Sequence, residues 1–287
     1  QVNDYVESIN QYTAGKLDGV TATTGDGLTI PAAGGKDTTV LIAGDYSNGN
    51  DGLVSKTATN VAGLKGQTIN LVELSVSHYL LARALESAGL KLPDIKTVNT
   101  SDADIISAYS TPDVTTVATW NPQLSEVKSK PGSHLLFDSS QIPGEILDAL
   151  LVDTATLKAN PNLGKALAGI WYETVSLMLR QDAEGKAARA AMAKLSGTTP
   201  ESFESQLKTT AVYPTAKDAL AYVTGPDIIA AHDRIRAFSF SQGLFGAGAT
   251  SQDMVGIQFE SKTLGDKQNI KLRFNPGFMR LAAEGKL

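Results

Sequence analysis

Apolar residues recur along the chain at two spacings, one typical of helices and one typical of strands. The first segment repeats at helical spacing, from Val2 through Tyr5 and Ile9 to Tyr12. Turn-forming residues then lead into residues 38–44, TTVLIAG, whose continuous apolar run predicts a buried strand. This alternation of predicted helices and strands indicates an α/β protein.

The same order repeats through the middle of the chain and then changes. Further strands are expected at 64–73, 95–99, 114–119, 134–140 and 142–153, with helices at 75–89, 102–109 and 121–128 between them. The second half predicts long helices at about 159–181, 183–195, 200–209, 216–223 and 226–240. Polar connectors and one short helix are expected after them.

This layout predicts two lobes. Lobe 1 would comprise residues 1–57 and 140–287 and lobe 2 residues 58–139, with crossing strands near 53–59 and 137–144. Because ligands of open α/β sheets sit beyond the carboxyl ends of strands, residues at those ends are the site candidates. The chain opens in a helix where such a sheet normally starts with a strand, so we expect a native N-terminal strand and helix to be absent.

The composition excludes several classes of function. Net charge is −5 and Lys and Arg are scattered, so nucleic acid is not an expected partner. The absence of Cys excludes disulfides, thiolate catalysis and Cys-ligated metal sites. The three His residues lack metal-ligand spacing, and no nucleophile elbow, phosphate loop or dinucleotide fingerprint is present in context. We therefore expect no metal, no cofactor and no enzymatic activity.

Carboxylates and an aromatic ring stand at the predicted strand ends of lobe 1. Asp26 lies in TTGDGL at the end of one strand, and Asp45 and Tyr46 end the strand TTVLIAG. Because D-G is also a common turn dipeptide, a turn accounts for Asp26 slightly better than binding does, whereas the two interpretations weigh evenly for Asp45. Acidic groups here would favour a cation or a donor-rich neutral solute over an anion.

In lobe 2, the turn between the strand ending at Glu73 and the following helix is a second candidate position. Glu73 either contacts the ligand or complements the helix dipole, and the first is favoured because Ser75 can serve as the N-cap. Ser77 can exchange hydrogen bonds with a ligand. His78 could tune the pocket, although a lone His near a helix start is more often structural.

Trp120 and Asn121 stand at the end of the strand TTVAT. A Trp more often packs in a core, but its place at a strand end favours a ligand wall, where stacking on a planar cation would contribute about 0.5–2 kcal/mol. The ligand-binding residues that we predict from both lobes are Asp26, Asp45, Tyr46, Glu73, Ser77, His78, Trp120 and Asn121.

Several segments, in order, resemble a known family. VAGLKGQTINL, SVSHYLLARALESAGL and DIKTVNTSDADIISAYSTPDVTTVATWNPQLSEV are similar to the second lobe of nitrate/sulfonate/taurine-type ABC transporter binding proteins. GDYSNGNDGLVSK, NLVELSVSHYLLARAL, NTSDAD, TWNPQLSEV and FDSSQIPGEI resemble more closely a urea-type subgroup, encoded beside urea carboxylase and serving guanidine. The resemblance covers residues 4–172.

The resemblance implies a two-lobed periplasmic binding protein of the type II-like class. Such a protein would be a monomeric receptor, periplasmic or lipid-anchored on the outer face of the cytoplasmic membrane. It would close over a small guanidine- or urea-like molecule and deliver it to the ABC permease subunits. An importer for sulfonate, nitrate or another small anion is the alternative within the class. A pyrimidine-synthase-like enzyme, disfavoured by the missing Cys, and a ligand sensor are the alternatives outside it.

Overall fold

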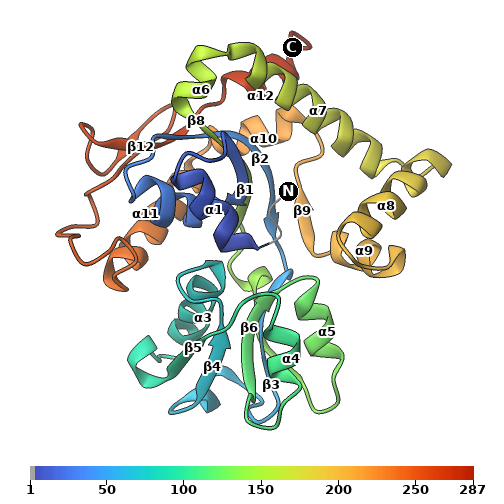
Figure 1. Ribbon diagram of the computed structural model, residues 1–287, viewed down its shortest axis with the longest axis vertical. Coiled ribbons are helices and arrows are strands. Elements are labelled where there is room, and N and C mark those ends of the chain that lie inside the picture. The colour runs from blue at the N-terminus through green and yellow to red at the C-terminus, as the bar shows by residue number, and fades with distance from the viewer. Residues whose placement is uncertain (1–3) are drawn as a thin grey trace. The chain divides into compact units, whose positions relative to one another are not determined.

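The computed structural model describes residues 4–287, which form two compact units (Figure 1). Unit 1 comprises the chain up to Tyr46, Gly144–Glu204 and Ala211–Leu287, and unit 2 comprises Ser47–Pro143 and Ser205–Thr210. Both mix helices with a sheet, which confirms the predicted α/β class. Val2, placed in the first predicted helix, lies outside the described residues.

The sheet of unit 1 has the strand order β1-β8-β2-β12-β10-β11, with β9 beside β2. Its strands are β1 Gly19–Thr23, β2 Thr38–Ser47, β8 Leu147–Asp153, β9 Thr210–Val212, β10 Gly256–Gln258, β11 Thr263–Leu264 and β12 Ile270–Phe274. Strand β8 lies antiparallel between β1 and β2, whereas β12 runs parallel to β2. The sheet is therefore mixed.

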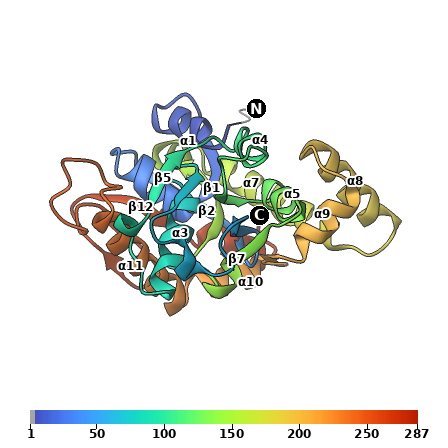
Figure 2. The same ribbon diagram turned by 90° about the horizontal axis from the view of Figure 1, so that it is seen from below.

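The helices of unit 1 are α1 Tyr5–Thr13, α2 Thr24–Gly27, α6 Thr154–Ala159, α7 Pro161–Leu179, α8 Ala183–Leu195, α9 Pro200–Leu207, whose last residues belong to unit 2, α10 Ala216–Val223, α11 Pro226–Ser241 and α12 Gly277–Ala283. Most of them surround the sheet, whereas α8 and α9 extend away from it beyond the end of α7 (Figures 1 and 2). Leu41 and Ile42 of β2 pack with Leu157 of α6 and Ala168 of α7 in one buried cluster. Successive residues of β2 point to opposite faces of the sheet, and both faces are buried, so the strand is a continuous apolar run.

Gly44 shows how closely α7 approaches the sheet. A Cβ atom added at this position of β2 would lie 2.5 Å from the ring of Trp171 on α7. Only a residue without a side chain leaves room for that ring. The glycine therefore lets the Trp171 ring pack against β2 at the position next to Asp45.

The sheet of unit 2 has the order β5-β4-β6-β3-β7. Its strands are β3 Asp51–Ser55, β4 Thr68–Leu71, β5 Lys96–Asn99, β6 Thr116–Trp120 and β7 His134–Asp138, and its helices are α3 Val76–Ser87, α4 Ile105–Tyr109 and α5 Gln123–Ser129. Strand β4 runs parallel to β5 and β6, and β3 runs antiparallel to β6 and β7. Val54, Tyr109, Val117 and Leu124 belong to its buried core.

The first passage of the chain between the units lies earlier than the sequence suggested, whereas the second, after Pro143, lies within the expected 137–144. β3 was expected to be a crossing strand, but its pairing with β6 and β7 places it inside unit 2, and the first passage follows Tyr46. The segment Ser205–Thr210 enters unit 2 as an additional excursion. Asn50 anchors this segment, because its side-chain amide donates to the Thr210 hydroxyl and accepts from the Thr209 hydroxyl.

The connector expected after the long helices also contains strands. β10, β11 and β12 are short, and β12 pairs with the first residues of β2. Short strands with polar neighbours give little periodic signal, and parallel pairing with a distant strand leaves none in the local sequence. These strands were therefore missed.

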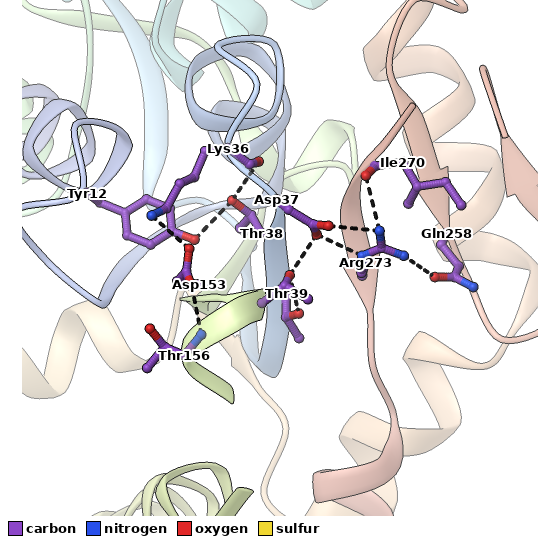
Figure 3. Close-up of polar contacts among 11 residues, drawn as sticks. Tyr12, Lys36, Asp37, Thr38, Thr39, Asp153, Thr156, Gln258, Ile270 and Arg273 are labelled. Carbon is purple, nitrogen blue, oxygen red and sulfur yellow. Dashed lines mark hydrogen bonds and ion pairs between the residues drawn. The ribbon is translucent and has the colours of Figure 1, made fainter. Parts of the chain in front are cut away.

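The amino edge of the unit 1 sheet, where β2 begins and β8 ends, is closed by ion pairs (Figure 3). The Arg273 guanidinium donates to both oxygens of Asp37, at 2.7 and 2.9 Å. Lys36 pairs with Asp153 at 2.7 Å, and the hydroxyl of the buried Tyr12 donates to Thr38. The Arg273–Asp37 pair links β12 to the residue before β2. The Lys36–Asp153 pair links the loop before β2 to the end of β8.

Candidate functional site

At the opposite, carboxyl edge of the unit 1 sheet, the three predicted residues of that unit lie close together. β1 and β2 end there and β8 begins, with Asp148 paired in register to both Thr23 and Asp45. The register of β2 on β8 shifts between Ala43 and Asp45, so Asp45 and Asp148 are partners at a β-bulge, a feature common beside functional sites. Tyr46 follows on β2.

Asp26 is buried, with 4% of its surface exposed, in the short helix α2 that follows β1. The Tyr5 hydroxyl donates to its Oδ2 at 2.7 Å and accepts the Thr23 backbone N–H at 3.0 Å. Burial and then the charge of Asp26 raise the pKa of Tyr5, and Asp148 adds to this shift. The Tyr5 phenol therefore stays protonated and donates to Asp26.

In unit 2, the turn between β4 and α3 carries Glu73, Ser77 and His78. Ser75 is the N-cap of α3, as predicted, and accepts the Ser77 N–H at 3.2 Å. The Glu73 carboxylate instead accepts the Thr97 hydroxyl of β5. The side-chain cap of α3 is thus Ser75, and the role of Glu73 stays a prediction.

The backbone of this turn is unusual. Leu74 has φ of 65°, in the left-handed region, and its side chain is 54% exposed. His78 Nδ1 accepts the Leu74 N–H at 3.3 Å, and burial lowers the pKa of His78 while Glu73 opposes that shift. The ring is thus a neutral acceptor that holds a strained conformation, a feature that clusters at functional sites.

Ser77 points into the unit with its hydroxyl buried and without a hydrogen-bond partner. It lies in the first turn of α3, a helix of 12 residues, whose N-terminal N–H groups carry a partial positive charge. A buried hydroxyl without a partner costs about 1–3 kcal/mol. Of the residues that we predicted in unit 2, Ser77 therefore has the strongest case for a ligand contact.

Trp120 ends β6 and pairs in register with Asp51, which is 5% exposed at the start of β3. The Asn121 amide donates to Asn50 Oδ1 at 2.7 Å and accepts from the Ser125 N–H and hydroxyl. Asn121 therefore fixes the strand end that carries Trp120.

The described residues contain neither a metal-binding cluster nor a membrane-spanning helix. Between residues 4 and 287, no cluster of three or more His, Asp or Glu side chains could hold a metal ion. No helix in the same range is long and apolar enough to cross a membrane.

A family model described as NMT1/THI5 like matches residues 4–180, more than half of the chain. The chain belongs to the NMT1/THI5-like family. The taurine-binding periplasmic protein of Escherichia coli (strain K12) is 29% identical over 131 residues, covering 45% of this chain and 40% of that protein. Alignments with the curated relatives reach less than half of their length.

Solved structures place this NMT1/THI5-like chain among two-domain binding-protein folds. The alkanesulfonate-binding protein SsuA from Xanthomonas axonopodis pv. citri, bound to MOPS, superposes with a TM-score of 0.67 at 21% identity, over 83% of this chain and 79% of that one. The desulfurization enzyme DSZB superposes with a TM-score of 0.60 at 13% identity, over 94% and 87%. At these identities the likeness shows the fold alone, and the urea-type subgroup stays a prediction.

Some residues of this NMT1/THI5-like site were not predicted. Asp148, the second residue of β8, was missed because the antiparallel place of this strand between β1 and β2 has no local signal. Tyr5 was assigned only to a helix face. Asp51 was not singled out, and the turn-rich loop before it gives way to β3 at that residue.

Proposed function

We propose that this protein is the solute-binding receptor of an ABC-type importer and that it captures a small nitrogen-rich solute, guanidinium or urea. Membership of the NMT1/THI5-like family and the likeness to a taurine-binding periplasmic protein support the receptor class. The proposal includes a periplasmic or lipid-anchored location, a monomeric state and a permease partner. Ligand-driven closure of the units would be the signal to that permease, with no chemical step.

The observation that carries the choice of solute is the pair Asp45 and Asp148. They are partners on neighbouring strands, at a point where the register of β2 on β8 shifts between Ala43 and Asp45. Such a bulge re-aims side chains and is common beside functional sites. Carboxylates offer only acceptors, which suit a solute rich in N–H groups through charge-assisted hydrogen bonds. Asp26 and Tyr5 extend the acidic face.

A small anion is the second candidate, and one observation favours it. The Ser77 hydroxyl without a partner lies at the N-terminus of α3, a position suited to a sulfonate or nitrate oxygen. The two candidates therefore rest on different residues. Asp45 supports the cation or donor-rich solute, and Ser77 supports the anion.

Titration calorimetry of the ligand-stripped protein with guanidinium, urea, taurine and nitrate separates these candidates. We expect guanidinium or urea to bind, and Asp45→Asn to weaken that binding at least tenfold, about 1.4 kcal/mol, because a carboxylate acceptor is lost. Glu73→Gln tests the corresponding acidic residue of unit 2, where we expect a smaller loss because that carboxylate already accepts from Thr97.

Binding of taurine or nitrate alone would contradict the choice of solute. If Ser77→Ala then weakened that binding and Asp45→Asn did not, the anion receptor would replace the first candidate. Turnover of any of the four compounds would contradict the receptor class itself.

A further inference from the structure

Among the described residues, some buried side-chain polar atoms have no hydrogen-bond partner. They are Thr24 Oγ1, Ser77 Oγ, Gln123 Oε1, Trp171 Nε1, Tyr172 Oη, Tyr213 Oη and His232 Nε2. Such atoms are rare in folded proteins and costly, so each requires an explanation. The Tyr213 hydroxyl is notable because the backbone of Tyr213 is hydrogen-bonded to Gly44, the residue before Asp45.

The position of Tyr213 is fixed from several sides within unit 1. Its N–H donates to the Gly44 carbonyl at 3.1 Å, which places its backbone next to Asp45 on β2. Its ring lies 6.2 Å from that of Tyr46 and stacks at 5.3 Å on that of Tyr222. The Tyr222 hydroxyl in turn donates to the Gly144 carbonyl at 2.8 Å, which anchors the stack.

The chemical state of this hydroxyl follows from its surroundings. The residue is 9% exposed, and burial is the main cause that raises the pKa of Tyr213, with Asp45 adding to it. The hydroxyl therefore keeps its proton and can both donate and accept. Asp45, as a carboxylate, can only accept.

We propose that the Tyr213 hydroxyl is a specificity-determining contact of the solute site and that, together with Asp45, it selects a urea-type solute over guanidinium. This inference rests on the proposed function and narrows its solute class. Urea carries N–H donors for Asp45 and a carbonyl oxygen for the Tyr213 proton, whereas guanidinium has no acceptor and would leave that proton unpaired. A site built to bond a polar group discriminates strongly against an analogue that lacks it.

Tyr213→Phe tests this inference because it removes one oxygen atom and keeps the ring stack. In calorimetric titrations, we expect the variant to bind urea at least tenfold more weakly and guanidinium within threefold of the wild-type affinity. Without ligand, its melting temperature should equal or exceed that of the wild type, because the lost hydroxyl has no partner in the fold.

Tyr172→Phe is the matched control. Tyr172 on α7 also has a buried hydroxyl without a partner, but it packs on the Leu41 and Ile42 cluster. Its removal should leave the affinity for urea unchanged. An equal loss of affinity in the two variants would overturn the inference.

The remaining outcomes separate the inference from the proposed function. If the wild type binds urea or guanidinium and Tyr213→Phe binds both as the wild type does, the inference fails and the receptor stands. A lower melting temperature of ligand-free Tyr213→Phe would show a structural role for the hydroxyl and also overturn the inference. If the wild type binds neither compound, the proposed solute class and the inference both fail.

Discussion

Strand β2 has an aspartate at each end, and the two ends of the strand differ in almost everything else. Asp37, just before β2, accepts two hydrogen bonds from Arg273 and one from Thr154. Asp45, near the other end, is in register with a second carboxylate, Asp148. One edge of the sheet thus pairs an aspartate with an arginine, and the other places two aspartates opposite each other.

The hydroxyls repeat this contrast. At the amino edge, the Tyr12 hydroxyl donates to Thr38, and those of Thr39 and Thr154 bond to each other. At the carboxyl edge, the buried hydroxyls of Thr24 and Tyr213 have no partner. Saturated polar groups stabilise a fold, whereas unsatisfied ones weaken it unless something else bonds to them. We infer that the amino edge serves stability and the carboxyl edge serves binding.

The largest effect that we expect is on the pH dependence of stability and comes from His232. Its contribution must be known before the pH dependence of the two edges can be compared. Burial lowers the pKa of this ring to about 4, while its Nδ1 lies 2.9 Å from the Ile228 carbonyl. Between pH 6.5 and 4 the unfolded chain therefore binds a proton that the folded protein does not. Acidification over this window should lower the free energy of unfolding by about 3 kcal/mol.

His232→Leu should abolish that part of the pH dependence. Differential scanning calorimetry at pH 7 and pH 4 is the appropriate measurement, because the common chemical denaturants are candidate ligands of this protein. A variant that loses as much stability on acidification as the wild type would show that another group controls this window.

A smaller effect is expected at the amino edge itself. Arg273→Met keeps the stem of the side chain but removes its bonds to Asp37, and should cost about 1–2 kcal/mol at pH 7 because the pair is only partly buried. Arg280→Met is the matched control. Its pair with Glu260 is more exposed and should contribute under about 0.5 kcal/mol.

The pH dependence of this effect has a definite sign. Burial alone would raise the pKa of Asp37, but bonds from Arg273 and Thr154 outweigh it and lower that pKa. A lowered folded-state pKa gives stability that is present above about pH 4 and lost as the pH falls through the folded value. The calorimetric difference between Arg273→Met and the wild type should therefore shrink at pH 3, and a constant difference would point to lost packing instead.

Much of the fold could be predicted from local pattern. The helix Ala183–Leu195 and the helix Ala216–Val223 have the bounds expected from their periodicity and caps, and Ser75 caps α3 as predicted. β2 was evident from its apolar run. These features depend on residues that are near one another in the sequence, and side-chain spacing records such features directly.

Only part of the candidate site could be predicted, because it depends on residues that are far apart in the sequence. Asp45 could be placed at a strand end, but its register with Asp148 depends on β8 entering the sheet between β1 and β2. Tyr213 reaches Gly44 only because the chain returns from unit 2 after Thr210. Long-range pairing of this kind leaves no periodic trace in a single sequence.

The most direct test of the contrast compares Asp45→Asn with Asp37→Asn, two identical changes at opposite ends of one strand. For each variant, calorimetry would give the affinity for urea and guanidinium and the melting temperature without ligand. We predict that Asp45→Asn weakens binding at least tenfold with little loss of stability, and that Asp37→Asn melts at a lower temperature and binds as the wild type does. Unchanged binding in Asp45→Asn, or equal effects of the two substitutions on both quantities, would contradict the assignment of binding to the carboxyl edge.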